Sequence, residues 1–125
     1  MLPVLLVAAT LVSQFTPSWV ALGERAVTND VARDTITVRG ANGTFQAIKI
    51  SVRGSAVRFN RVVLRFENGD EREVQMDVRV PAGGETRTIH LKGDERAIRS
   101  VDFWYDATSV GSRGAVVQLL GRSRT

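Results

Sequence analysis

From residue 19 onward the chain alternates apolar and polar residues in short runs, which are separated by clusters of Gly, Asn and Asp. In the run from 71 to 80, for example, the apolar residues occupy alternate positions: Val74, Met76, Val78 and Val80. A period of two places one side of a run in a core and the other in water, as in a half-buried β-strand. No window keeps apolar residues at helical spacing over more than two turns, so the pattern predicts an all-β protein.

The runs predict eight strands. They are expected at residues 19–27, 35–39, 44–52, 56–67, 71–80, 86–91, 98–105 and 115–120. Many short strands at regular spacing, each with one buried face, are typical of two antiparallel sheets packed together. We therefore expect a single antiparallel β-sandwich of about eight strands with jelly-roll-like wiring.

Local signals predict turns and one irregularity within these strands. Asn42–Gly43 and Asn68–Gly69 are hairpin signals, because a type I′ turn needs positive φ at both central residues. The apolar positions also change from odd numbers, ending at Phe59, to even numbers, beginning at Val62. An inserted residue explains such a change, which predicts a β-bulge near Asn60–Arg61.

Length and composition limit the chemistry. A chain of 125 residues is enough for one domain. It contains no cysteine, which excludes disulfides, thiolate zinc sites and cysteine nucleophiles. A single histidine, His90, is too few for a histidine-rich metal site, and it has the outward parity of its strand. We expect no metal and no cofactor.

The net charge of +4 raises the question of an acidic partner, and all but two of the 17 basic residues are arginine. Many of these arginines stand close to an acidic residue in the sequence, as in Asp70/Arg72 and Glu85/Arg87. No run of consecutive basic residues occurs. We therefore favour paired charges over a basic patch and expect no nucleic-acid partner.

The first 18 residues differ from the rest. Leu2 to Val12 is a largely apolar run, shorter than the roughly 20 residues that span a bilayer. Its length suits the hydrophobic region of a signal peptide, and Thr16 and Ser18 are small enough to precede a cleavage site. No basic residue precedes the run, so a buried first strand is the alternative. With a signal peptide, residues 19–125 form a periplasmic or secreted domain that keeps no stable membrane anchor.

The most suggestive candidate site is the aromatic run Phe103–Trp104–Tyr105. If Phe103 and Tyr105 fill the core, Trp104 points outward on the same side as Asp102 and Asp106. An exposed tryptophan beside carboxylates stacks on a sugar ring or anchors a protein partner. Trp104 and Asp102 are therefore the candidate ligand-binding residues, and a glycan or an envelope protein is the candidate partner. The alternative is that a neighbouring loop or strand covers the indole.

No catalytic residue can be assigned. A triad would need His90, and no orienting partner for it is evident in the sequence. A pair of acids for glycoside hydrolysis cannot be singled out among the 13 Asp and Glu residues. We therefore expect no enzyme activity.

Several short segments resemble those of a known family. They are Trp19, Leu22–Gly23, Arg25, Val27, Arg33–Asp34–Thr35–Ile36, Phe66–Glu67–Asn68–Gly69, Ala82–Gly83–Gly84–Glu85–Thr86–Arg87, Arg96–Ala97–Ile98 and Leu120–Gly121–Arg122. Together they resemble an uncharacterised family of small secreted bacterial β-sandwich proteins. The expected strand order is also similar, at the level of the fold, to galactose-binding-like jelly rolls. The resemblance implies a signal peptide and a single domain, and it implies no activity.

The sequence thus favours an exported, non-catalytic binding or interaction module of the cell envelope. A purely structural or accessory envelope domain is the alternative, and a glycan-directed hydrolase is the third.

Overall fold

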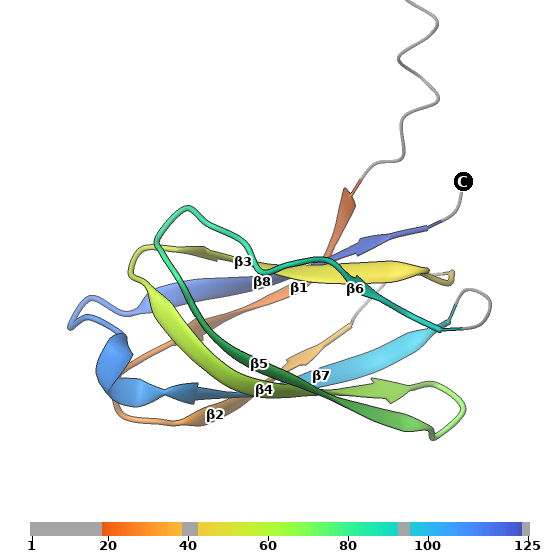
Figure 1. Ribbon diagram of the computed structural model, residues 1–125, viewed down its shortest axis with the longest axis horizontal. Helices are drawn as coiled ribbons and strands as arrows, with labels where there is room; N and C mark the ends of the chain where they lie inside the picture. The colour runs from red at the N-terminus through yellow and green to blue at the C-terminus, as the bar shows by residue number, and fades with distance from the viewer. Residues whose placement is uncertain (1–18, 39–42, 93–95, 124–125) are drawn as a thin grey trace, which may run out of the picture.

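Two four-stranded antiparallel sheets pack face to face in the computed structural model, which describes residues 19–38, 43–92 and 96–123 (Figure 1). The strands are β1 (Trp19–Val27), β2 (Arg33–Thr37), β3 (Ala47–Arg53), β4 (Val57–Phe66), β5 (Glu71–Val80), β6 (Ile89–His90), β7 (Ile98–Asp106) and β8 (Ala115–Arg122). One sheet has the order β1-β8-β3-β6 and the other has the order β2-β7-β4-β5. The expected β-sandwich of eight strands is confirmed.

The chain passes back and forth between the two sheets. Among the described strands, β4 and β5 are the only consecutive pair that lies in one sheet, and every other connection crosses to the opposite sheet. This wiring is that of a jelly roll, as the sequence predicts.

The two hairpin predictions have opposite outcomes. The hairpin at Asn68–Gly69 is confirmed, because β4 pairs with β5, but its turn is not of type I′: Gly69 has a φ of 95°, whereas Asn68 is not one of the described residues with a positive φ. The one at Asn42–Gly43 is wrong, because the strands on either side, β2 and β3, belong to different sheets. Asn42 itself lies outside the described residues, as does the expected signal peptide. An Asn-Gly dipeptide favours a local turn only. Which sheet the next strand joins depends on where the apolar face of that strand packs.

The strand expected at residues 86–91 is much shorter than predicted. Only Ile89 and His90 form a regular ladder with β3. The segment still follows β3, because the amide of Thr86 donates to the carbonyl of Ile50 and the amide of Leu91 donates to the carbonyl of Gln46, both at 2.8 Å. It therefore forms the irregular edge of its sheet.

The core lies between the sheets and is built from the inward side chains that the alternation predicts. Phe103 and Tyr105 of β7 and Phe59 of β4 are buried, and the ring of Phe103 meets that of Phe59 edge-on with the centroids 6.0 Å apart. The bulge near Asn60–Arg61 is also confirmed, since the pairing of β4 with both of its neighbours shifts between Phe59 and Arg61. Beyond the bulge Val62, Leu64 and Phe66 point inward, which turns Arg61 and Arg65 to the outer side of the sheet.

Candidate binding surface

The candidate site lies on the outer side of the β2-β7-β4-β5 sheet. We call this surface the Trp104 face and define it by Arg33 and Thr35 of β2, Asp102 and Trp104 of β7, Arg61 and Arg65 of β4, and Glu71 and Glu73 of β5. The strand register sets its layout, because Arg33, Trp104 and Arg61 form one row across three strands. Thr35 lies directly opposite Asp102 in the next row.

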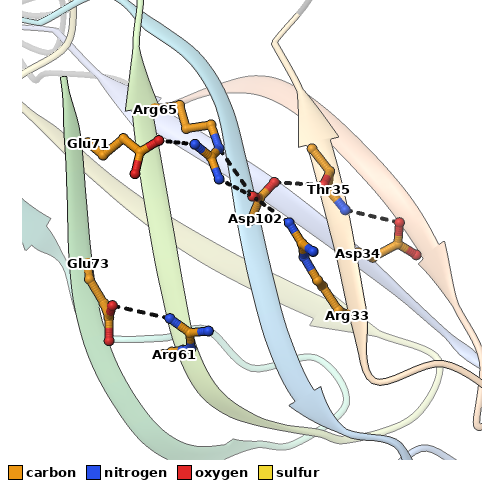
Figure 2. Close-up of polar contacts among 8 residues, drawn as sticks. All are labelled: Arg33, Asp34, Thr35, Arg61, Arg65, Glu71, Glu73 and Asp102. Atoms are coloured by element: carbon orange, nitrogen blue, oxygen red, sulfur yellow. Dashed lines mark hydrogen bonds and ion pairs between the residues drawn. The ribbon is translucent and has the colours of Figure 1, made fainter. Parts of the chain in front are cut away.

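Asp102 is held by three neighbours on the adjacent strands (Figure 2). The hydroxyl of Thr35 donates to Oδ1 at 2.7 Å. Both Nε and Nη2 of Arg65 donate to Oδ2, at 3.2 and 2.9 Å, and Nη2 of Arg33 donates to the same oxygen at 3.2 Å. The Asp102 side chain is only 5% exposed although it is on the outer side of the sheet. Asp102 is therefore not open to solvent, because arginines from both neighbouring strands cover it.

The surroundings of Asp102 keep it ionised. Burial by itself raises the pKa of the carboxyl, but the hydrogen bonds from Thr35, Arg65 and Arg33 outweigh it, so that the pKa is lowered from its ordinary value of 3.8. The hydrogen bond to Asp102 is also the main reason that the pKa of Arg65 is raised. A carboxyl with a lowered pKa is a poor general acid at neutral pH. Asp102 is suited to positioning the two arginines.

Trp104 lies between two arginines from the strands on either side of it. The guanidinium carbon of Arg61 is 3.8 Å from the centre of the indole, and that of Arg33 is 4.8 Å from it. These distances are those of cation–π contacts. The outward direction of Trp104 is thus confirmed, but the side chain is half-buried, because the two arginines flank the ring.

The two arginines of β4, Arg61 and Arg65, also contact acidic side chains of the edge strand β5. Nη1 of Arg61 donates to Oε1 of Glu73 at 3.1 Å, and Arg65 forms an ion pair with Glu71 (Figure 2). The three arginines of the Trp104 face therefore stand among three acidic residues. This agrees with the prediction of paired charges. The exposed pairs of Arg61 with Glu73 and of Arg65 with Glu71 contribute little to stability and are easily exchanged for other partners, whereas the carboxylate of Asp102 is buried.

Asp106, which shares the outward side of β7, has a local role. Its carboxylate accepts hydrogen bonds from the amide and the hydroxyl of Thr108, at 3.0 and 2.7 Å, and so caps the 3-10 helix Ala107–Ser109. These bonds lower the pKa of the Asp106 carboxyl. His90, by contrast, belongs to the other sheet, and its side chain is exposed there.

The described residues also bear on metal binding and membranes. Within residues 19–38, 43–92 and 96–123, no three His, Cys, Asp or Glu residues come together as metal ligands would. The same ranges hold no helix that has the length and apolar character to cross a bilayer.

A family model described as "Domain of unknown function (DUF2541)" matches residues 1–121. The chain belongs to this family. The resemblance to an uncharacterised family is therefore confirmed, and membership assigns no activity.

One solved structure with a similar fold is that of AlgX from Pseudomonas aeruginosa, with a TM-score of 0.54 and 15% sequence identity. The match covers 80% of this chain and 25% of AlgX, so the chain spans about a quarter of the length of that protein. At this identity the likeness concerns the fold alone. No curated protein sequence matches the chain.

Proposed function

We propose that this protein is a non-catalytic interaction module of the cell envelope and that it binds a protein partner through the Trp104 face. The observation that carries the proposal is the stack of Arg33, Trp104 and Arg61. Tryptophan and arginine are the residue types most enriched at the energetic centres of protein interfaces. Here they come together from three adjacent strands of a regular sheet.

The geometry favours a protein over a glycan. Stacking a sugar on an indole needs one open face of the ring, and arginines flank Trp104 at 3.8 and 4.8 Å. A guanidinium that lies over an aromatic ring keeps its N–H donors at its edges, where they reach carboxylate and carbonyl oxygens of a partner. The side chain of Arg33 is 55% exposed, so donors of this kind are accessible.

A site on a sheet also has the rigidity that an interface needs. The buried carboxylate of Asp102 holds Arg33 and Arg65 in place before any partner arrives. Such preorganisation reduces the entropy lost by long side chains on binding. Both carboxylate oxygens of Asp102 accept hydrogen bonds from neighbouring side chains, which favours this positioning role over catalysis.

The envelope location rests on the N-terminal sequence. The apolar run from Leu2 to Val12 has the length of a signal-peptide core and ends before the first strand at Trp19. A domain without cysteine folds in the periplasm independently of disulfide formation. Mass spectrometry of the protein recovered from the periplasmic fraction tests this point, and an intact Met1 in the cytoplasmic fraction would contradict it.

The interface is tested by affinity capture with matched baits. The wild-type protein and Trp19→Phe, which alters the tryptophan on the other sheet, should retain the same envelope protein. Trp104→Ala and Arg61→Gln should both lose it while keeping the far-UV circular dichroism of the wild type. Equal retention by all four baits, or by none, would refute the Trp104 face as the site.

A glycan array run with the same four proteins decides between the two partner classes. A glycan that binds the wild type but not Trp104→Ala would show that the partner is a carbohydrate and not a protein. Such a result would require Arg33 or Arg61 to move off the indole, because both lie within 5 Å of its centre, at 4.8 and 3.8 Å.

A further inference from the structure

A second feature lies away from the Trp104 face, at the end of the sandwich where β1 and β3 finish and β8 begins. It is an open cavity of about 450 Å³, lined among others by Ala26, Arg53, Gly54, Arg113, Gly114 and Val116. Cavities that hold small molecules measure about 300–1,000 Å³. The volume therefore suits a small ligand, and the three strands that border the cavity belong to the sheet opposite the Trp104 face.

Two glycines bring the backbone segments around the cavity close together. Gly54 and Gly114 have φ values of 94° and 78°, which L side chains rarely adopt. A Cβ on Gly114 would lie 2.8 Å from the carbonyl oxygen of Val27, and one on Gly54 would lie 3.2 Å from the carbonyl oxygen of Gly114. The close approach of β1, β3 and the start of β8 thus requires glycine at positions 54 and 114. These backbone segments form part of the wall of the cavity.

The lining combines apolar surface with positive charge, part of which is not paired with an acidic residue. Ala26 and Val116 face each other across the β1–β8 pairing, while Arg53 and Arg113 supply two guanidinium groups. No acidic residue belongs to the lining. Arg53 has one ion pair, with Glu24 at 3.3 Å, in which both side chains are about half exposed, at 59% and 49%. Arg113 is exposed and has no ion pair with any residue in the described part of the chain.

We propose that this cavity binds a small molecule that joins a compact oxyanion, such as a carboxylate or a phosphate monoester, to a short apolar chain. Arg113 and Arg53 bind the oxyanion, because a guanidinium matches carboxylate and phosphate oxygens with parallel N–H donors. Ala26 and Val116 take the apolar chain. The solvent-exposed pair of Arg53 with Glu24 is weak enough to give way to the ligand.

The proposal is tested by two-dimensional ¹H–¹⁵N NMR of the full chain titrated with three probes: hexanoate, hexyl phosphate and hexanol. The amide signals of Gly54 and Gly114 are the reporters, since both residues line the cavity. At least one anionic probe should produce saturable shifts at these amides, and hexanol should bind at least about tenfold more weakly, because it lacks the charge that strengthens each hydrogen bond. The comparison of hexanoate with hexyl phosphate identifies the preferred oxyanion.

Arg113→Gln should weaken binding of the preferred probe by about tenfold or more. Arg79→Gln is the matched control, because it removes the same charge from an exposed position on β5 and should leave the affinity unchanged. Trp104→Ala should also leave it unchanged, which separates this site from the Trp104 face. The absence of saturable shifts at tens of millimolar, equal binding of hexanol, or unaltered binding by Arg113→Gln would each overturn the proposal.

Discussion

Replacing Asp102 by Asn isolates the contribution of one buried charge to this sheet. The amide keeps the size of the carboxylate, and its oxygen can still accept from Arg33 and Arg65 while its nitrogen donates to the hydroxyl of Thr35. The substitution therefore removes the negative charge and retains the contacts. We expect the folded sheet to persist with a reduced free energy of unfolding.

The size of the effect follows from the contacts of Asp102. The guanidinium groups of Arg33 and Arg65 stay charged, so their hydrogen bonds to the Asn oxygen remain charge-assisted. What is lost is the ion-pair attraction of the Asp102 carboxylate, about 1–3 kcal/mol in total before solvent screening. The side chains of Arg33 and Arg65 are 55% and 37% exposed, which reduces this figure. Asp102→Asn should cost about 1–2 kcal/mol at neutral pH, and Asp102→Ala, which loses every contact, about 2–4 kcal/mol.

The stability lost in Asp102→Asn should depend on pH. The pKa of Asp102 is lowered in the folded chain from its ordinary value of 3.8. The stabilisation by its carboxylate is therefore fully present above that value and is lost as the pH falls through the lower folded pKa. The difference in stability between the wild type and Asp102→Asn should be largest at neutral pH and should shrink in the acid range, where the wild-type carboxyl is protonated.

Urea unfolding followed by circular dichroism at a series of pH values measures both effects. Asp77→Asn is the control, because Asp77 is exposed and its φ of 44° is one that asparagine adopts readily. A cost for Asp102→Asn no greater than that for Asp77→Asn would refute the reasoning. A cost that stays constant as the pH falls well below 3.8 would refute it as well, because the carboxyl of the unfolded wild type is then protonated and its stabilising charge in the folded state is being lost.

Three further outcomes are expected. Phe103→Ala should lower the free energy of unfolding in urea by about 3–5 kcal/mol, because it empties a fully buried site. Gln75→Ala, at an exposed position, should lower it by less than about 1 kcal/mol, and equal losses would mean that the strand register is wrong. Removal of residues 1–18 should leave the unfolding midpoint unchanged, and an unfolded product would place that segment in the core. In a variant with Trp104 as the sole tryptophan, Arg61→Ala should increase quenching by acrylamide, and strong protection in both proteins would show that another part of the chain covers the indole.

Features that depend on residues adjacent along the chain could be predicted from the sequence. The period of two placed Phe103 and Tyr105 in the core and Trp104 outside it, as the structure shows. The change of parity after Phe59 located the bulge, and Asn68–Gly69 located a hairpin. In each case the side-chain direction or the turn geometry depends on local backbone conformation, which a short stretch of sequence specifies.

The partners of Trp104 and Asp102 needed the tertiary structure. The bulge implied that Arg61 and Arg65 face outward, but nothing local indicated that β4 lies beside β7, or that β2 brings Arg33 to the other side of Trp104. Strand neighbours arise from the packing of residues far apart in the chain. The same long-range pairing explains why the hairpin expected at Asn42–Gly43 is absent and why Asp102, polar and outward by parity, is buried beneath two arginines. Alternation along a strand decides which way a side chain points, and only the order of the strands decides what it meets there.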